Sequence, residues 1–381
     1  MRLLHTADWH LGRLFAGHDL LEAQRHALDG LVAAAADVRP DVIVVAGDLY
    51  DRAVPSEDAV GLLDDAFQRL ATVAPVAAIA GNHDSGPRLD FGRRLFRGSG
   101  VHLAGTSRGG VERVIAGDDH GPVHLHLLPY ATPEEARYET GRDDLTSHDD
   151  ATRARLARVS LDSAARHVLV AHLFAQGGEE TPDCERDITV GGLATVGLDA
   201  FAAFHYTALG HLHRPHDVGG PRVRYSGSLV RSSFAEATHE KSASVVEIDR
   251  GGGVRVEPIP LPALHGMRTL RGTFADLLAA AATDDRRERD LVKVVLTDEV
   301  LVPGSRDRLR QLYPFLLEHV SERPVAVARD AAPAPPAATA TSPHAYVDGF
   351  FADRYRGTAD PAVRALARDC MEQALRAEHR P

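Results

Sequence analysis

Five short blocks of this chain carry carboxylate, amide and imidazole side chains, the groups that bind divalent metal ions in proteins. In chain order the blocks contribute Asp8 and His10, then Asp48, then Asn82, His83 and Asp84, then His172, and finally His211 and His213. Each block stands where an apolar run ends, so a fold could bring all five to one edge of a sheet. This pattern predicts a two-metal enzyme that acts on a phosphate ester.

The first two blocks offer ligands that suit transition metals. Residues two apart on a chain leaving a strand project to the same side, so Asp8 and His10 can reach one ion. A carboxylate with an imidazole suits Mn, Fe or Zn better than Mg or Ca, which favour oxygen ligands. The two oxygens of Asp48 can bridge two ions, although a Gly-Asp pair is also a common turn. Asp51 is either a supporting residue or a turn residue.

The block Gly81-Asn82-His83-Asp84 is the most distinctive of the five. The amide oxygen of Asn82 can bind a metal ion without adding charge, which leaves His83 to act on the substrate. We expect Asp84 to orient His83 and to fix its tautomer. A polar loop is the alternative, but the block directly follows a buried strand, where ligand sites of open α/β sheets gather.

The later histidines also follow apolar runs. A single histidine at a strand end, such as His172, is usually a core or rim residue. His211 and His213 are separated by one residue and occupy the same topological position as the carboxylates, which favours metal binding.

Runs rich in Val, Ile, Leu and Ala alternate with segments of helical spacing and predict a layered α/β domain. Four runs are typical of strands buried on both faces, namely 42–46, 76–80, 167–171 and 206–210. The segments 19–38 and 56–72 are predicted helices. Three further strands are predicted in a second, more antiparallel sheet packed on the first, at 123–128, 223–226 and 244–248.

Three prolines within 258–262 disfavour the continuation of a helix or a central strand, so we predict a domain boundary there. The predicted parts are a first domain over 1–260, a small α/β capping domain over 261–330, a Pro/Ala-rich linker over 331–343 and a helical segment over 344–381. In the capping domain we expect strands at 267–271 and 291–296 and helices at 273–282 and 305–319. The last segment is too short to form a core alone, so it must dock on a partner.

The composition limits the partners and the compartment. A formal net charge of -11 argues against coating nucleic acid through the net field. It does not exclude a nuclease, because bound dications change the local charge of an acidic site. Only Cys184 and Cys370 occur, so neither a disulfide framework nor a thiolate zinc site is expected. No apolar stretch approaches the roughly 20 residues of a membrane span, and Asp8 comes too early for a signal peptide, so we expect a cytoplasmic protein.

The five blocks, in this order, resemble the signature of the calcineurin-like metallophosphoesterase superfamily, Asp-x-His, Gly-Asp, Gly-Asn-His-Asp, a later histidine and Gly-His-x-His. The resemblance implies a four-layer β-sandwich flanked by helices and a site for two divalent ions. It assigns one ion to Asp8, His10, Asp48 and His213, and the other to Asp48, Asn82, His172 and His211. It makes His83 the catalytic histidine near the leaving group, supported by Asp84.

The surrounding sequence is similar to the SbcD family, the nuclease subunits of bacterial SbcCD complexes. The similarity lies in Met1 to Gly12, Gly47 to Asp51, Gly81 to Ser85, Leu128 to Tyr130 and Tyr225 to Ser228, followed by Phe234, Glu236 and Lys241. It covers 1–260 well and the later parts more loosely. Ala171 stands where this family often has glycine, a change that leaves His172 in place.

The SbcD resemblance implies a DNA nuclease dependent on two divalent ions, most simply Mn²⁺, with 3'–5' exonuclease activity on double strands and endonuclease activity. It implies processing of hairpins and DNA ends in repair and recombination. It also implies a homodimer that binds a coiled-coil ATPase like SbcC through the C-terminal segment, and no membrane.

Two alternatives remain. One is a small-molecule phosphodiesterase or phosphatase of the same superfamily, which would not need the capping domain or the apolar C-terminal segment. The other is a scaffold without catalysis, but such proteins usually lose metal ligands, whereas this chain keeps every block of the signature.

Overall fold

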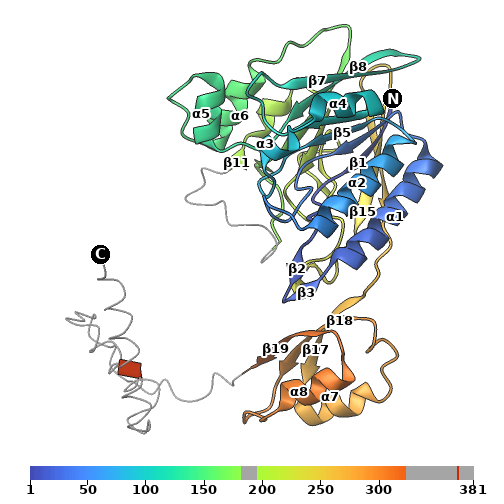
Figure 1. Cartoon of the computed structure of the whole chain (residues 1–381), viewed down its shortest axis with the longest axis vertical. Helices are drawn as coiled ribbons and strands as arrows, with labels where there is room; N and C mark the ends of the chain where they lie inside the picture. The colour runs from blue at the N-terminus through green and yellow to red at the C-terminus, as the bar shows by residue number, and fades with distance from the viewer. Residues whose placement is uncertain (182–194, 323–366, 369–381) are drawn as a thin grey trace. The chain divides into compact units, whose positions relative to one another are not determined.

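The computed structural model of the chain (Figure 1) describes residues 1–181, 195–322 and 367–368. The structure divides into two compact units, Met1–Arg323 and Pro324–Pro381, and the fold described below is that of the first. The predicted linker and the predicted C-terminal helical segment lie outside the described residues, apart from the helical residues 367–368. Within the described part of the chain, no helix combines the length and apolar character needed to cross a membrane.

The first sheet contains six strands in the order β16-β15-β1-β4-β5-β6. Their bounds are β1 Arg2–Thr6, β4 Val42–Val45, β5 Val76–Ile79, β6 Val101–Ala104, β15 Ser242–Ile248 and β16 Val254–Pro260. Strands β1, β4, β5 and β6 run parallel to one another, and β15 and β16 join antiparallel beside β1. Because the four parallel strands end at the same edge, the residues that follow them come together there.

The second sheet also contains six strands, in the order β13-β14-β12-β9-β8-β7. Their bounds are β7 Glu112–Asp118, β8 Gly121–Leu128, β9 Arg166–His172, β12 Tyr206–Gly210, β13 His216–Asp217 and β14 Val223–Tyr225. The central strands β8, β9, β12 and β14 are parallel, and only the outer strands β7 and β13 are antiparallel to their neighbours.

Two predictions about the second sheet are therefore wrong. The sheet is mainly parallel, because the fully buried runs 167–171 and 206–210 form its centre rather than extending the first sheet. The predicted strand at 244–248 belongs to the first sheet, where β15 pairs with β1. A buried apolar run shows that a strand is covered on both faces, but not which of two sheets it joins.

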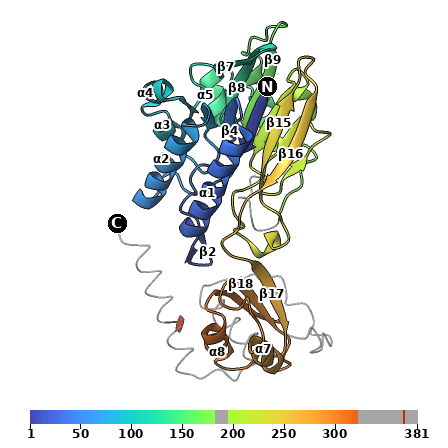
Figure 2. The ribbon, with the colours of Figure 1, turned by 90° about the vertical axis from the view of Figure 1, so that its right-hand side faces the viewer.

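The two sheets pack face to face, and their facing side chains form one fully buried cluster that includes Val44, Ile79, Leu125 and Val168. Each such side chain contributes about 1.5–3 kcal/mol by leaving water. Helices α1 (Leu21–Val38) and α2 (Glu57–Ala71) cover the outer face of the first sheet, as Figure 2 shows. A third cluster covers the far face of the second sheet. The predicted layered α/β sandwich with flanking helices is confirmed.

The two long helices begin and end at residues with clear local causes. The hydroxyl of Ser56 accepts a hydrogen bond from the backbone N–H of Ala59 and so caps the start of α2. Helix α1 ends at Val38, and the next residue, Arg39, adopts a left-handed conformation with φ of 48°. Both helices match the predicted segments 19–38 and 56–72 to within two residues at each end.

The remaining helices and turns are short. They are α3 Gly86–Leu89, α4 Arg93–Phe96, α5 Pro133–Thr140, α6 His148–Leu156, and the 3₁₀ turns η1 Arg97–Ser99, η2 Leu198–Phe201 and η3 Phe234–Glu236. Two small ribbons complete the first domain, β2 Leu14–Phe15 with β3 His18–Asp19 and β10 Phe174–Ala175 with β11 Thr195–Val196.

The capping domain is a three-stranded parallel sheet with two helices. Its elements are β17 Met267–Gly272, α7 Phe274–Ala281, β18 Leu291–Leu296, α8 Ser305–Leu312 and β19 Leu316–Ser321. The predicted helix 305–319 is wrong in its second half, because Pro314 disfavours a helical conformation for the residue before it. Tyr313 accordingly leaves the helical region, with φ of −119° and ψ of 87°. The domain limits at 260 and 330 stay predictions.

The buried Tyr225 of β14 ties the second sheet to the segment after β9. Its hydroxyl accepts a hydrogen bond from the N–H of Ala175 at 2.7 Å and donates one to the carbonyl of Leu173 at 2.9 Å. Tyr225→Phe leaves both buried backbone groups unsatisfied, so we expect the free energy of unfolding in urea to fall by about 1–3 kcal/mol. Tyr138→Phe is the control, because that side chain is exposed and its change should be neutral. Equal stability of the two variants would contradict the expectation.

Candidate metal centre

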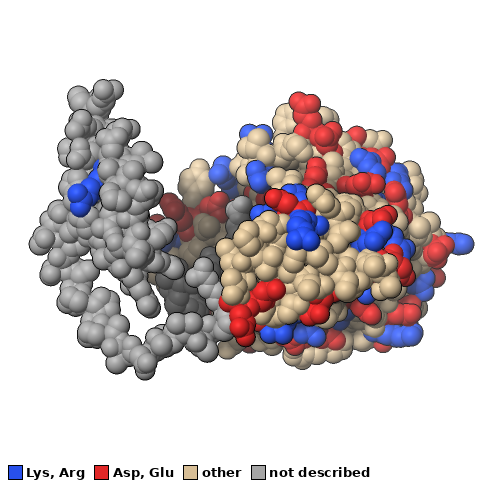
Figure 3. Space-filling model, turned by 90° about the horizontal axis from the view of Figure 1, so that it is seen from below, with Lys and Arg blue, Asp and Glu red and all other residues tan. Residues whose placement is uncertain are grey.

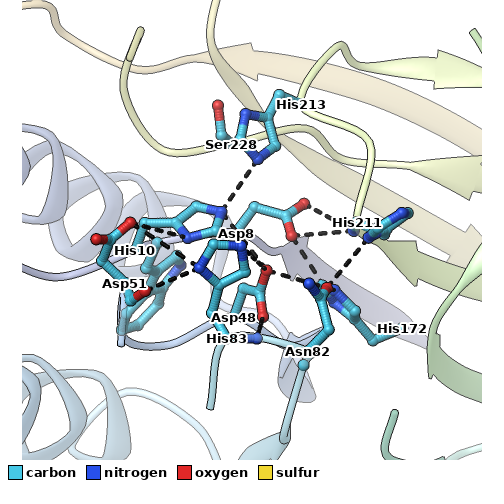
Figure 4. A network of polar contacts seen from close by, with 12 residues as sticks. Asp8, His10, Asp48, Asp51, Asn82, His83, His172, His211, His213 and Ser228 are labelled. Carbon is cyan, nitrogen blue, oxygen red and sulfur yellow. Dashed lines mark hydrogen bonds and ion pairs between the residues drawn. The ribbon is translucent and has the colours of Figure 1, made fainter. Parts of the chain in front are cut away.

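The predicted metal ligands come together at the edge where the parallel strands of both sheets end (Figure 4). Asp8 follows β1, Asp48 follows β4 and Asn82 follows β5, whereas His172 ends β9 and His211 follows β12. Three overlapping groups have potential ligand atoms within 4.8 Å of one another, namely Asp8 with His10 and His213, His10 with Asp48 and His83, and Asp8 with Asp48 and His172. The residues gathered from five chain segments therefore form one cluster.

Asp48 lies between the two halves of this cluster. One oxygen of its carboxylate, Oδ2, is 3.6 Å from Nε2 of His10 and 3.5 Å from Nε2 of His172. On the first side, the Nε2 atoms of His10 and His213 are 3.0 Å apart. On the other side, the amide oxygen of Asn82 is 2.9 Å from Nε2 of His172. A carboxylate in this position can be shared by two cations.

The protonation of His172 shows that a cation fits the second half of the cluster. Its Nδ1 is 2.9 Å from the carbonyl oxygen of Ala46, which can only accept, so Nδ1 carries the proton. In the neutral ring, Nε2 then has a free lone pair that faces the amide oxygen of Asn82 and the carboxylate of Asp48. Three acceptors that face one another without a proton are the arrangement that a metal ion satisfies.

Burial keeps these imidazoles neutral. Desolvation lowers the pKa of His10, His172 and His211, and neighbouring histidines lower the pKa of His10 and His211 further. A neutral imidazole is the form that binds metal ions, so the environment prepares the three rings as ligands.

Four residues of the cluster have positive φ angles, which residues other than glycine rarely adopt. The φ angles are positive at Asp8 (52°), His10 (46°), Asp48 (49°) and His211 (113°). Each such conformation costs on the order of 1–3 kcal/mol unless the surroundings hold it. Hydrogen bonds between the two loops hold three of them, since the N–H of Asp8 donates to Gly47 and the N–H of His10 donates to Asp48. This strain had no signal in the sequence.

Two glycines allow the loops to close around Asp48. A Cβ atom on Gly81 would lie 2.1 Å from Oδ1 of Asp48, and one on Gly47 would lie 2.3 Å from Nδ1 of His172. Gly47 also has a positive φ of 93°. Any larger residue at these two positions would displace a ligand of the centre.

The contacts of Asp84 differ from the expected contact with His83. Its carboxylate accepts hydrogen bonds from the backbone N–H groups of Leu49, Tyr50 and Gly81, at 2.9 to 3.0 Å, and so fastens the Asp48 loop to the Asn82 loop. Burial, together with the charge of Asp48, raises its pKa. The residue was expected to orient His83 because it is adjacent in sequence, but its side chain points to the backbone of the neighbouring loop.

Asp51 takes the role that was expected of Asp84. Its backbone carbonyl lies 2.8 Å from Nδ1 of His83 and therefore accepts the proton on that nitrogen. Its carboxylate lies 4.0 Å from the same nitrogen and 3.8 Å from Nδ1 of His10. His83 itself is anchored by its N–H, which donates to Oδ1 of Asp48 at 2.8 Å. The Nε2 atom of His83 is left facing the cluster, 4.0 Å from Oδ2 of Asp48.

The buried carboxylate of Glu236 lies beside His213 and is paired with Lys241. Oε1 of Glu236 is 3.9 Å from Nδ1 of His213, an electrostatic rather than a hydrogen-bonding distance. The ammonium group of Lys241 contacts Glu236 and donates to the carbonyl of His213 at 2.9 Å and to Ser228 at 2.7 Å. Although burial opposes its charge, Lys241 and His213 hold the pKa of Glu236 well below its usual range. In the sequence these residues were visible only through the SbcD resemblance.

Comparison with known proteins identifies the family of this chain. A family model described as calcineurin-like phosphoesterase matches residues 1–117 and so defines the class of enzyme. A second model, described as the type 5 capsule protein repressor C-terminal domain, matches residues 263–355. The SbcD subunit of the nuclease SbcCD from Staphylococcus epidermidis is 30% identical over 321 residues, which cover 83% of this chain and 84% of that protein. The chain belongs to the SbcD family and is a hydrolytic nuclease with a metallophosphoesterase domain that takes divalent metal ions.

Two solved structures are similar to this chain only at low scores. The protein TT1561 of Thermus thermophilus is 16% identical, with a TM-score of 0.38 over 68% of this chain and 98% of that one. A dimetal phosphatase from Danio rerio is 13% identical, with a TM-score of 0.40 over 69% of this chain and 99% of that one. At these scores neither structure adds to the argument about this site.

The position of Glu236 behind His213 predicts a loss of metal affinity on neutralisation. We expect Glu236→Gln to weaken Mn²⁺ binding by about 10- to 100-fold, because it removes a buried negative charge 3.9 Å from Nδ1 of His213 that raises the basicity of the ring. Isothermal titration of the metal-free protein measures the affinity.

Glu257→Gln is the matched control, since that carboxylate is exposed on the outer strand β16. The same affinity in both variants would show that Glu236 serves only the packing of its segment. Circular dichroism spectra of the two proteins test whether both remain folded.

Proposed function

We propose that this chain is the nuclease subunit of an SbcCD-type complex and cleaves DNA phosphodiester bonds with two divalent ions. The observation that carries the proposal is the position of the Asp48 carboxylate between the two groups of ligands. One ion would be held by Asp8, His10, Asp48 and His213, and the other by Asp48, Asn82, His172 and His211. The mixed carboxylate, amide and imidazole donors favour Mn²⁺ over Mg²⁺.

The residues around the centre support a hydrolytic mechanism. Two bound divalent ions supply Lewis-acid activation of the scissile phosphate and of the attacking water. His83 faces the cluster through Nε2 while its Nδ1 proton is held by the carbonyl of Asp51. Protonated His83 can therefore donate from Nε2 to the departing sugar oxygen, and the carboxylate of Asp51, 4.0 Å from Nδ1, stabilises the imidazolium. Such general acid catalysis contributes typically about 10² to 10⁴ in rate.

The proposed substrates are double-stranded ends and hairpins, cut by 3'–5' exonuclease and endonuclease action in repair and recombination. The formal net charge of -11 supports action together with a partner. On the face shown in Figure 3, acidic and basic side chains of the described residues are interspersed, without a broad basic surface. Sequence-independent DNA binding depends on neutralising many phosphates. We therefore propose that an SbcC-like coiled-coil ATPase supplies that binding, and that the complex acts in the cytoplasm.

The ATPase would bind the segment 344–381, which lies outside the described residues apart from 367–368. The apolar spacing of Val347, Phe350, Phe351 and Tyr355 supports this role. Such a segment buries its apolar side only against a partner.

An apolar surface over α2, α3 and α4 supports the proposed homodimer. Phe91 and Leu95 expose 84% and 80% of their surface, and Val60 and Phe96 expose 46% and 43%. Val60, Phe91 and Phe96 line a groove of about 680 Å³, together with Phe67. An exposed apolar surface of this kind is typical of a protein interface. A second copy of the chain is the occupant that we propose.

Replacing the apolar side chains should separate the dimer. We expect Phe91→Asp combined with Leu95→Asp to convert the protein from dimer to monomer in sedimentation equilibrium, because each buried carboxylate would lack a partner. Leu301→Asp is the control, since Leu301 is 69% exposed in the capping domain. A dimer that survives the double substitution, or a wild-type monomer, would contradict the proposed interface.

The two central residues of the proposed mechanism should give different phenotypes. His83→Ala should retain two metal ions but lose about 10² to 10⁴ of the cleavage rate, whereas Asp48→Ala should lose metal as well. Metal content is measured by mass spectrometry, and cleavage on blunt and hairpin DNA with Mn²⁺, with and without the ATPase partner. His120→Ala, at an exposed histidine, is the control. Full activity of metal-loaded His83→Ala protein would overturn the assignment of His83.

A further inference from the structure

A cavity of about 480 Å³ lies beside the metal centre, between helix α5 and the loops that follow β5, β6 and β8. Its wall includes Asn82, one of the proposed ligands, at the inner end. Three other lining side chains have no role in the proposed reaction, namely Arg108, Tyr130 and Tyr138. Their chemistry determines what the cavity can bind.

Tyr130 connects the cavity to the metal centre. Its ring lies 6.4 Å from the ring of His172, centre to centre, in an edge-to-face orientation. Burial raises the pKa of Tyr130 to about 12, with further contributions from the charges of Glu135 and Asp48. The phenol therefore stays neutral and lies within the field of the proposed bridging carboxylate. A substrate group in the cavity would be adjacent to the phosphate at the metal centre.

Tyr138 forms a flat, exposed surface at the outer end. The side chain is 76% exposed, although it belongs to helix α5. The guanidinium group of Arg108 lies 5.2 Å from the centre of its ring, a cation–π contact that limits the motion of both side chains. An ordered aromatic ring beside an arginine is the arrangement on which nucleobases stack in proteins that bind single strands.

The charges of the cavity favour a base over a phosphate group. Glu134, Glu135 and Glu139 line it together with Arg108. Glu139 is neutralised by Arg155 at 3.0 Å, and Glu135 accepts a hydrogen bond from the N–H of Thr132 at 2.8 Å, which leaves the exposed Glu134 without such a contact in the described part of the chain. A carboxylate repels phosphate but accepts hydrogen bonds from the amino groups of bases.

We propose that this cavity binds an unpaired nucleobase of the strand being cut, next to the scissile phosphate. The inference rests on the proposed DNA nuclease function. The base stacks on Tyr138, is bounded by Tyr130 on the inner side, and directs its polar edge toward Glu134. Only a base that has left the duplex can enter, so the cavity favours cleavage at frayed ends and at the loops of hairpins, where unpairing costs least.

The experiment removes a base from the DNA and the aromatic ring of Tyr138 from the protein, separately and together. The substrates are hairpin oligonucleotides with one abasic nucleotide, moved in turn through the positions next to the cleavage site. Wild-type protein, Tyr138→Ala and Tyr138→Phe are compared as full chains loaded with Mn²⁺ and combined with the SbcC-like ATPase partner, and kcat/KM is measured. Hydrolysis of bis(p-nitrophenyl) phosphate, which has no base, reports on the metal centre alone.

We expect an abasic nucleotide at one position to lower kcat/KM of the wild-type protein about tenfold, as the loss of one stacked base would. Tyr138→Ala should lose about as much on intact DNA and nothing further on the abasic substrate. Tyr138→Phe should behave as the wild type, and all three should hydrolyse the small ester equally.

The cavity assignment is overturned if no abasic position affects the wild-type rate, or if the losses from Tyr138→Ala and the abasic nucleotide multiply. It is also overturned if Tyr138→Ala slows the small ester as much as DNA. Hydrolysis of the small ester without cleavage of any DNA would overturn the proposed function as well, whereas DNA cleavage without base dependence overturns the cavity alone.

Discussion

The hydrogen bond between His172 and the carbonyl of Ala46 joins the two sheets at the metal centre, and the rest of the site depends on it. It connects the last residue of β9 to the residue that follows β4, across the interface of the sandwich. It also places the ring proton on Nδ1 and so directs the Nε2 lone pair to the proposed metal. One contact therefore both links the two sheets at the site and sets the tautomer of the ligand. Glycine at 210 is part of the same constraint, since a Cβ there would lie 2.0 Å from the Ala46 oxygen.

The strained backbone explains why this centre needs such a large sandwich. Four positive φ angles among its residues together cost several kcal/mol, by the usual magnitude of about 1–3 kcal/mol each. The residue types do not remove this cost, because aspartate and histidine tolerate a positive φ only somewhat better than other residues. The buried side chains between the sheets and under α1 and α2 provide the opposing free energy. The loops are thus held in place by strands whose own conformations are relaxed.

Much of this arrangement could be predicted from the sequence, for an identifiable reason. Runs buried on both faces mark strands, and polar blocks after such runs mark the edge where ligands gather, so the clustering of Asp48 and Asn82 was expected from local pattern. The ligand role of His172 rested on the family resemblance. What could not be predicted depends on contacts between distant segments. The choice of sheet for 244–248 and the attachment of Asp84 to the backbone of Leu49 are both settled by neighbours in space. The end of α8 is different, because the signal, Pro314, was present in the sequence and apolar spacing was given more weight.

The two prolines of β16 have a consequence for how copies of the chain can associate. The N–H of Leu261 donates to the carbonyl of Lys241, the residue directly before β15. The backbone groups of the odd-numbered residues of β16 therefore face β15, and those of Pro258 and Pro260 face away from it. Proline has no N–H, so the edge strand β16 of the first sheet lacks hydrogen-bond donors at two successive positions that face away from β15. Another strand cannot add there in register, which protects the sheet from strand-by-strand growth into aggregates. Association of two copies by pairing of strands at this edge is therefore disfavoured.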